Sequence, residues 1–197
     1  MELPAASSER VVYDGKIFQA VQVRVRLPHR DGESDVEVVR HAPSVGIAAM
    51  PDPGTLLLVR QYRYAAGGYV WELPAGSVDE GEEPELAARR EAHEELGLVA
   101  GRVERLGELV ARPGYCTEAM TFYRATELRP PGPDDPQAHQ DEDESIEVRS
   151  FSLAEIRHLI REGEIRDMKT AAVLPLLELS DDENRVKPAP QPSARWR

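Results

Sequence analysis

The fold of this chain is decided by one stretch, GSVDEGEEPELAARREAHEELGL, which spans residues 76–98. Pro84 suits the first turn of a helix, because its missing N–H would have no partner there. Gly97 suits the left-handed position that commonly ends a helix. The residues between them are mostly Ala, Leu, Arg and Glu, which are good helix formers. The stretch therefore predicts a helix that begins near Pro84 and stops at Gly97.

Three carboxylates share one face of this predicted helix, because Glu91, Glu94 and Glu95 stand at positions i, i+3 and i+4. Like charges at this spacing repel by about a few tenths of a kcal/mol per pair. Arg90 lies four residues before Glu94 and relieves part of that repulsion. Two interpretations follow from the helix alone. The face either binds a hard cation, Mg²⁺ with Mn²⁺ as the alternative, or is simply a solvated acidic surface.

The spacing of the whole stretch narrows the choice. It fills the pattern Gly-x5-Glu-x7-Arg-Glu-(apolar)-x-Glu-Glu-x-Gly-(apolar) without an error. This pattern resembles the Nudix box, the signature of hydrolases that cut nucleoside diphosphates linked to another group. The matching residues are Gly76, Glu82, Arg90, Glu91, Ala92, Glu94, Glu95, Gly97 and Leu98.

The resemblance also implies roles for individual residues. Glu91 and Glu95 occupy the positions that usually bind metal in Nudix enzymes, and the carbonyl of Ala75 resembles a backbone metal ligand of the ADP-ribose branch. The implied cofactor is Mg²⁺, with Mn²⁺ as an alternative. The resemblance also gives Glu82 the role of an outer carboxylate and Glu94 that of a helper carboxylate. Arg90 is the arginine that is expected to form ion pairs with these acids.

The flanks of the box resemble the ADP-ribose pyrophosphatase branch of the family. The segments that carry this likeness are residues 60–63, 72–76 and 112–114, and Pro113 stands about fifteen residues after the box, where that branch has a proline. The expected reaction is hydrolysis of ADP-ribose or a related nucleoside diphosphate sugar to a nucleoside monophosphate and a sugar phosphate. Arg63 and Arg112 are the implied substrate-binding arginines, although a surface arginine at a strand end also explains Arg63.

Two other functions stay open on the sequence. Tyr115 lies near the place where a tyrosine marks dinucleoside polyphosphate hydrolases, so that substrate class, or another nucleotide sugar, is one alternative. A non-catalytic, nucleotide-sensing Nudix domain is the other. A sensor is expected to carry a damaged box, and this box is intact.

The residue that activates water is expected in the acidic segment DEDESIEV, residues 141–148. By resemblance to the branch, Glu144 is one candidate and Glu142 the competing one. A solvated acidic loop explains either residue equally well. Members of the branch commonly dimerise through their N-terminal strands and stack adenine on an aromatic residue there, for which Tyr13 and Phe18 are the candidates. The resemblance thus implies a homodimer.

The composition limits the classes of function. The chain has 197 residues and a formal net charge of −12, which disfavours a nonspecific nucleic-acid or anionic-membrane binder. A single cysteine, Cys116, excludes an internal disulfide and a cysteine-rich zinc site. The first residues show no signal-peptide pattern, and no apolar run approaches bilayer length. A cytoplasmic enzyme with a small nucleotide substrate fits these features best.

The order of elements predicts an α/β fold. Strands on both sides of the box helix, followed by two late helices, fit a Nudix-type three-layer α/β/α sandwich around a mixed sheet. Strands before residue 43 are expected to form a small antiparallel sheet with a turn at Asp14-Gly15. The sequence predicts three parts. Residues 1–43 form N-terminal strands for dimerisation or substrate binding, residues 44–179 form the hydrolase domain, and residues 180–197 form a disordered tail.

Overall fold

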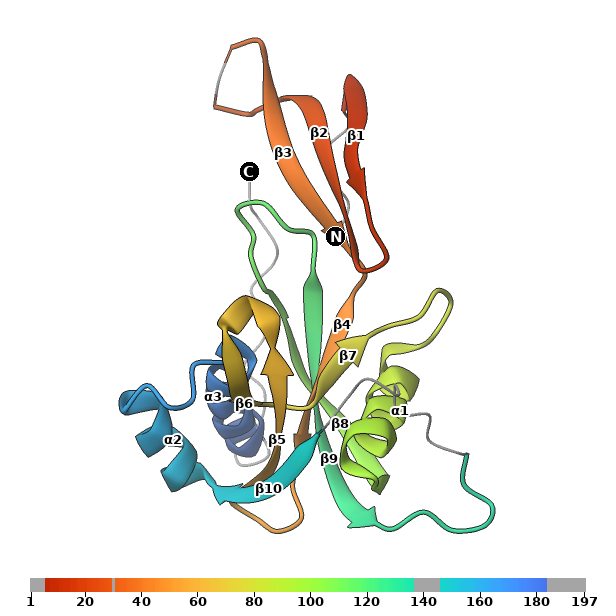
Figure 1. The fold of residues 1–197 in the computed structure, drawn as a ribbon, viewed down its shortest axis with the longest axis vertical. Helices are drawn as coiled ribbons and strands as arrows, with labels where there is room; N and C mark the ends of the chain where they lie inside the picture. Colours follow the sequence, from red (N-terminus) through yellow and green to blue (C-terminus); the bar gives the residue numbers. More distant parts are fainter. Residues whose placement is uncertain (1–5, 30, 137–145, 184–197) are drawn as a thin grey trace.

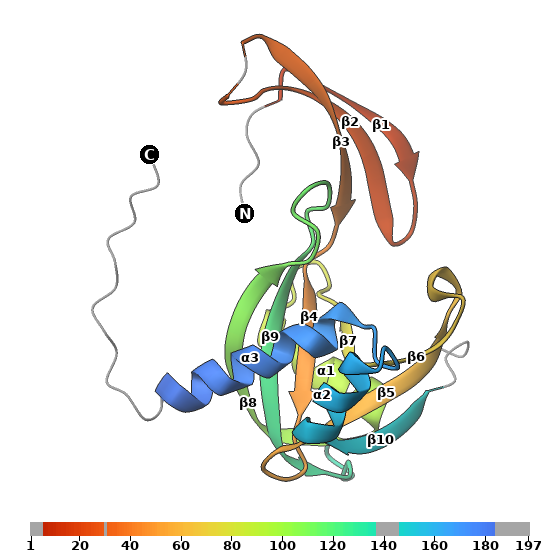
Figure 2. The ribbon, with the colours of Figure 1, turned by 90° about the vertical axis from the view of Figure 1, so that its left-hand side faces the viewer.

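The computed structural model describes residues 6–29, 31–136 and 146–183 of the chain. Helix α1 (Pro84–Leu96) covers one side of the strands, and helices α2 (Leu153–Arg161) and α3 (Met168–Glu183) cover the other side (Figures 1 and 2). The predicted three-layer α/β/α architecture is therefore confirmed.

Two sheets form the middle layer. One has the strand order β7-β4-β9-β8 and the other has the order β10-β5-β6. Strands β4 and β9 are parallel and all other pairs are antiparallel, so the first sheet is mixed, as expected. The strands are β4 (Ser44–Ala49), β5 (Thr55–Arg63), β6 (Gly68–Glu72), β7 (Ala75–Ser77), β8 (Val99–Val110), β9 (Ala119–Arg129) and β10 (Glu147–Ser152).

Two apolar cores separate the three layers. Alternate residues of β4 and β5 point to opposite faces, so that Ile47 and Val59 join the core under α1 while Ala48 and Leu58 join the core under α2 and α3. Both strands are almost fully buried for this reason. The continuous apolar run at the start of β5 predicted such two-sided burial.

Helix α1 begins and ends where the sequence predicted. Pro84 is in its first turn, and Gly97 adopts a left-handed backbone with φ of 66° just after its last residue. The side facing the sheet consists largely of alanines, and Ala87, Ala88 and Ala92 are buried. Small side chains let the helix backbone lie close to the sheet, which places the acidic residues of the helix near the neighbouring strand β7.

The N-terminal strands form a separate antiparallel sheet that projects from the main body (Figure 1). Its apolar face is built around Val21, Val23 and Val25. The predicted turn at Asp14-Gly15 does connect the first two strands. The order is β1 (Ser8–Asp14), β2 (Phe18–Arg26) and β3 (Glu33–His41).

Strand β3 also contacts the loop between β8 and β9. The Val39 N–H donates to the Tyr115 carbonyl at 2.7 Å, and the Thr117 N–H donates to the Val39 carbonyl at 3.0 Å. The His41 N–H donates to the Thr117 hydroxyl at 3.1 Å. These bonds fix the loop of residues 112–118 against the base of the N-terminal sheet.

Two segments differ from the prediction. The sequence predicts a loop over residues 65–69, but Tyr64–Ala66 form a short 3-10 helix and β6 begins at Gly68. The sequence also predicts a single strand over residues 71–75, and this is wrong, because β6 ends at Glu72 and β7 begins at Ala75. The break falls at Pro74, which has no N–H to donate.

Helix α3 is longer than predicted. Its expected end was Leu179, with the disordered tail from residue 180, yet it continues to Glu183 and passes through Pro175 without a break. Buried residues on both sides of the proline hold the helix against the sheet, and Arg124 forms an ion pair with Asp181 at 2.7 Å. The rest of the predicted tail lies outside the described residues.

Candidate active site

The acidic face of α1 packs directly on β7 at Gly76. A Cβ atom on Gly76 would lie only 1.9 Å from Oε1 of Glu91, which is far closer than any real contact. The missing side chain therefore makes the space that the Glu91 carboxylate occupies. This observation explains in physical terms why the first position of the sequence pattern is a glycine.

Glu95 is anchored to the same strand. Its carboxylate is buried, with 6% of the residue exposed, and Oε2 accepts a hydrogen bond from the Ala75 N–H at 3.0 Å. Ala75, Glu91 and Glu95, the three predicted metal ligands, are thus gathered where β7 meets α1.

Arg90 is the centre of an ion-pair network around this face. Its Nε and Nη2 donate to the two oxygens of Glu82 at 3.0 and 2.9 Å. Its Nη1 donates to Glu91 at 2.7 Å and to Glu94 at 3.0 Å, and Nη2 also reaches the Ser77 carbonyl at 3.0 Å. The predicted pairing of Arg90 with the acids is confirmed.

The electrostatics of this network favour the ionised form of Glu82. The hydrogen bond from Arg90 lowers the pKa of Glu82 below its ordinary value, and this effect outweighs burial. The same bond to Glu82, helped by Glu91 and Glu94, raises the pKa of Arg90 despite burial. One fixed positive charge therefore lies among four carboxylates, counting Glu95, so the face stays strongly negative.

The chemistry of these groups fits a hard divalent cation. Carboxylate and carbonyl oxygens are the ligands that Mg²⁺ prefers, and two of these carboxylates meet at one backbone turn. Within residues 6–29, 31–136 and 146–183, no cluster of three or more His, Cys, Asp or Glu has the geometry of a metal site. A cation held there would need the Ala75 carbonyl, water or phosphate oxygens beside Glu91 and Glu95.

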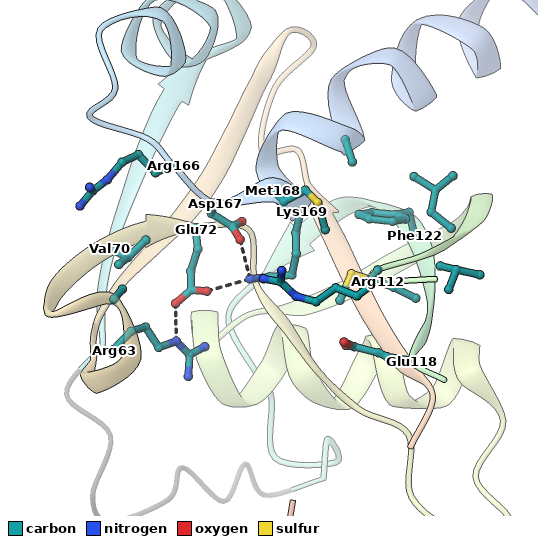
Figure 3. Close-up of a pocket in the computed structure, with 16 residues that line it drawn as sticks. Arg63, Val70, Glu72, Arg112, Glu118, Phe122, Arg166, Asp167, Met168 and Lys169 are labelled. Carbon is teal, nitrogen blue, oxygen red and sulfur yellow. Dashed lines mark hydrogen bonds and ion pairs between the residues drawn. The ribbon is translucent and has the colours of Figure 1, made fainter. Parts of the chain in front are cut away.

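A cavity of about 620 Å³ has Glu72, which precedes the segment that leads into β7, in its wall. It is formed by the β5–β6 turn, the loop between β8 and β9 and the start of α3 (Figure 3). Apolar side chains such as Val70 and Phe122 form part of the wall. The charged lining residues are the cations Arg63, Arg112, Arg166 and Lys169 and the carboxylates Glu72, Glu118 and Asp167.

One segment of the chain, residues 72–77, connects the cavity wall to the acidic face of α1. Glu72 lines the cavity, and Ala75 and Gly76 follow it within the same segment. On the other side, Ser44 pairs with Ser77 of β7, and its hydroxyl donates to Oε1 of Glu118 at 2.8 Å. The described residues that line the cavity include none from α1 or β7, so the acidic face is linked to the cavity wall through this segment and is not part of it.

The structure brings some of the predicted substrate-binding residues together. Arg63 and Arg112 come from segments far apart in the sequence and line the same cavity. Tyr13 does not line it, because it lies on the projecting sheet, half exposed, with its ring 5.4 Å from that of Phe18. The candidate bases Glu142 and Glu144 lie outside the described residues.

Five charged residues of the cavity were not assigned from the sequence, namely Glu72, Glu118, Arg166, Asp167 and Lys169. Asp167 caps α3 through its Oδ2, which accepts from the Thr170 N–H at 2.9 Å. The only sequence signal for these residues was that Asp167, a suitable helix N-cap, stands two positions before Lys169, one of the three lysines in the chain. Nothing in the local pattern connects it with Glu72, which lies almost a hundred positions earlier.

Comparison with known proteins agrees with this geometry. A solved structure described as an ADP compounds hydrolase superposes with a TM-score of 0.76, at 23% identity over 94% of this chain and 98% of that one. An ADP-ribose pyrophosphatase of Mycobacterium tuberculosis is 39% identical over 159 residues, or 80% of this chain and 75% of its own length. A GDP-mannose pyrophosphatase of Shigella dysenteriae is 37% identical over 180 residues, with 83% of this chain and 89% of its own length covered.

The model of the NUDIX domain matches residues 40–172, which include β4, α1 and the start of α3. The match covers the acidic face, Gly76 and every charged residue of the cavity. Since the family pattern extends over most of the chain and not only over the box, the chain belongs to the NUDIX family.

Proposed function

We propose that this chain hydrolyses the diphosphate bond of ADP-ribose or a related nucleoside diphosphate sugar. The products are a nucleoside monophosphate, which is AMP from ADP-ribose, and a sugar phosphate. One observation carries the proposal, namely that one segment contributes Glu72 to a cavity lined by Arg63 and Arg112 and, three and four residues later, meets the acidic face at Ala75 and Gly76. We infer that this segment brings a negative site for a cation close to arginines that can bind phosphates.

The two arginines reduce the charge repulsion that opposes attack of water on the diphosphate. A diphosphate repels the attacking water because its oxygens are negatively charged, and guanidinium groups neutralise that charge by bidentate hydrogen bonds. Arg63 comes from the end of β5 and Arg112 from the loop after β8, so they approach the cavity from two sides. We infer that together they hold the diphosphate and fix its orientation.

The acidic face supplies the second part. Glu91, Glu95 and the Ala75 carbonyl would hold Mg²⁺, with Mn²⁺ as an alternative. When bound, such an ion screens phosphate charge and lowers the pKa of bound water. Arg90 keeps Glu91 and Glu94 in place through its hydrogen bonds, and its ion pair with Glu82 fixes the arginine itself. Glu142 or Glu144 is proposed to accept the proton of the attacking water.

The substrate class is supported by the relatives and by the size of the cavity. One relative is named an ADP-ribose pyrophosphatase and another a GDP-mannose pyrophosphatase. A volume of about 620 Å³ suits a compound of nucleotide size. ADP-ribose is the first candidate because the segments around Arg63 and Pro113 resemble that branch, and GDP-mannose is the second.

The test is a panel of ADP-ribose, GDP-mannose and diadenosine tetraphosphate, incubated with Mg²⁺ and, separately, with EDTA. Chromatography of the products identifies the bond that is cut. We expect rapid conversion of ADP-ribose to AMP with Mg²⁺ and none with EDTA. Preference for GDP-mannose would change the substrate and keep the chemistry. Absence of hydrolysis, with binding retained, would replace the proposal by the sensor hypothesis.

We also infer that the chain is a homodimer joined through the projecting sheet. Apolar side chains are exposed there, which is unusual for a surface that contacts only water. The exposed residues are Val11, Val12, Tyr13, Ile17 and Phe18. Light scattering after size exclusion should give twice the chain mass of 21.9 kDa, and a mass of one chain would contradict the inference.

A further inference from the structure

Four charged side chains form a continuous cluster in the cavity wall, which we call the wall cluster: Arg63, Glu72, Asp167 and Lys169 (Figure 3). The Arg63 Nε donates to Glu72 Oε1 at 2.7 Å. The Lys169 Nζ donates to Glu72 Oε2 at 2.7 Å and to Asp167 Oδ1 at 2.9 Å. The cluster thus links the start of α3 to an arginine at the end of β5.

Burial makes this cluster depend on its pairing. Only 5% of the Glu72 side chain is exposed, and each of its oxygens accepts a hydrogen bond from a different cation. A buried carboxylate that loses one partner is strongly disfavoured. Burial by itself lowers the pKa of Lys169, but Asp167 and Glu72 outweigh it and raise the pKa, so the lysine stays charged.

The distribution of charge shows what Lys169 does for Arg63. With the lysine, two cations balance two carboxylates. Without it, Glu72 would keep the bond from Arg63 while Asp167 would lose its bond to a cation, and the unbalanced negative charge would compete with any phosphate for that arginine. Glu72 contacts Arg63 through Nε, at the base of the guanidinium, and the arginine side chain is 43% exposed. It can therefore meet a ligand in the cavity while it is held from behind.

We propose that Lys169 is a positioning residue, which neutralises and orients Glu72 so that Arg63 is presented to the diphosphate of the substrate. The inference rests on the proposed function and adds a residue from outside the Nudix box. Asp167 serves the same end, because it caps α3 through Thr170 and at the same time fixes the lysine.

Steady-state kinetics of Lys169→Gln with ADP-ribose tests the proposal. Binding through Arg63 acts on the ground state and the transition state alike, so KM is expected to rise about tenfold while kcat changes by less than about twofold. Lys169→Arg keeps the charge and is expected to recover most of the affinity. An unchanged KM for Lys169→Gln would overturn the proposal.

A double-mutant cycle with Arg63→Ala separates positioning from simple loss of stability. If Lys169 acts through Arg63, Lys169→Gln should change kcat/KM by less than about twofold once Arg63 is absent. The same tenfold loss in both backgrounds would show that the lysine acts independently of Arg63. Val173→Ala is the matched control, because Val173 is a fully buried residue of the same helix that does not line the cavity. It should lower the melting temperature and leave KM unchanged.

Binding of inorganic pyrophosphate in EDTA, measured by calorimetry, tests the inference apart from the reaction. The unaltered protein is expected to bind it, and Lys169→Gln should weaken this binding about tenfold, with no further loss in the Arg63→Ala background. A protein that binds pyrophosphate in this way but hydrolyses no nucleotide would end the proposed function and leave the positioning role supported. Equal binding by Lys169→Gln and the unaltered protein would reject the positioning role, even in an active enzyme.

Discussion

Gly76 decides the place of one carboxylate. Because its hydrogen leaves room for Glu91, any larger side chain must push that carboxylate away from β7. The clash is with the end of a flexible side chain and not with backbone, so the fold can accommodate it. We expect Gly76→Ala to remain folded while its activity falls at least about 100-fold, since a displacement of about 1 Å at a catalytic group can have that effect.

The measurements are kcat/KM for ADP-ribose and the midpoint of urea unfolding. Gly132→Ala is the control, because an added Cβ there meets Asp135 only at 3.5 Å, an ordinary contact, in a loop that does not line the cavity. Activity of Gly76→Ala within about threefold of the unaltered protein would mean that the position of Glu91 has no role in catalysis.

Glu95 offers a second test at this scale. Glu95→Gln keeps the size of the side chain and an oxygen to accept the bond from Ala75, so the fold should be unaffected. The charge is lost, and with it several kcal/mol of stabilisation for a bound cation, which corresponds to a loss of activity of about 10³-fold. Glu85→Gln is the matched control on the same helix, because Glu85 is exposed and pairs with Arg89. Near-normal turnover by Glu95→Gln would refute its assignment as a metal ligand.

Among the elements, α2 has a start that local sequence specifies completely. The Ser152 hydroxyl accepts from the Glu155 N–H at 3.2 Å, and a Glu155 oxygen accepts from the Ser152 N–H at 2.8 Å. These two bonds form a capping box, which a serine followed three residues later by a glutamate predicts from the sequence. We expect Ser152→Ala to lower the free energy of unfolding by about 1 kcal/mol.

Urea unfolding followed by circular dichroism measures this change. Ser150→Ala, at an exposed position of the preceding strand, is the control and should change stability by less than about 0.5 kcal/mol. Activity should be unchanged in both variants, because neither serine lines the cavity. Equal stability of the two variants would contradict a stabilising role for the cap.

These elements show which parts of the fold can be predicted from local sequence. Turn chemistry and caps are local, so the box helix, the N-terminal hairpin and α2 could be predicted closely. The extension of α3 past Pro175 could not, because tertiary contacts at Val173, Leu177 and Asp181 hold it. The division of one predicted strand at Pro74 depends likewise on pairing with β4, since the Ile47 N–H donates to the Pro74 carbonyl at 2.8 Å.

At the scale of the whole molecule, two networks connect stability to pH. The hydrogen bond from Arg90 holds the pKa of Glu82 below its ordinary 4.5. Burial raises the pKa of Asp167, but Lys169 and Thr170 outweigh it and lower the pKa below 3.8. The folded protein therefore binds fewer protons than the unfolded chain in acid. The free energy of unfolding should be largest above about pH 4.5 and should fall as the pH drops further.

Urea unfolding at several pH values between 3 and 7 measures this dependence. Asp167→Asn should be less stable than the unaltered protein at pH 7 and should lose less on acidification, because one of the titrating groups is gone. Asp52→Asn, in an exposed turn, should keep the original slope. An identical slope for Asp167→Asn would show that its carboxylate does not contribute to acid stability.

The candidate site, like the fold, has parts that the sequence predicts and parts that it does not predict. Glu91, Glu94 and Glu95 could be placed on one face because helix spacing is a local property. The wall cluster could not, because Glu72 and Lys169 are 97 positions apart and only the packing of α3 on β6 brings them together. The cavity could not be predicted either, because its lining residues come from segments that are far apart in the sequence.

The bonds between β3 and residues 115–117 join the N-terminal sheet to the loop that forms part of the cavity wall. Arg112 and Glu118 flank the residues that β3 holds, so one wall of the cavity rests on a sheet that lies almost wholly before the matched family region. A substitution in this sheet can therefore shift the cavity wall while every carboxylate of α1 keeps its place. We expect natural variation in the first forty residues to alter which compounds the cavity admits.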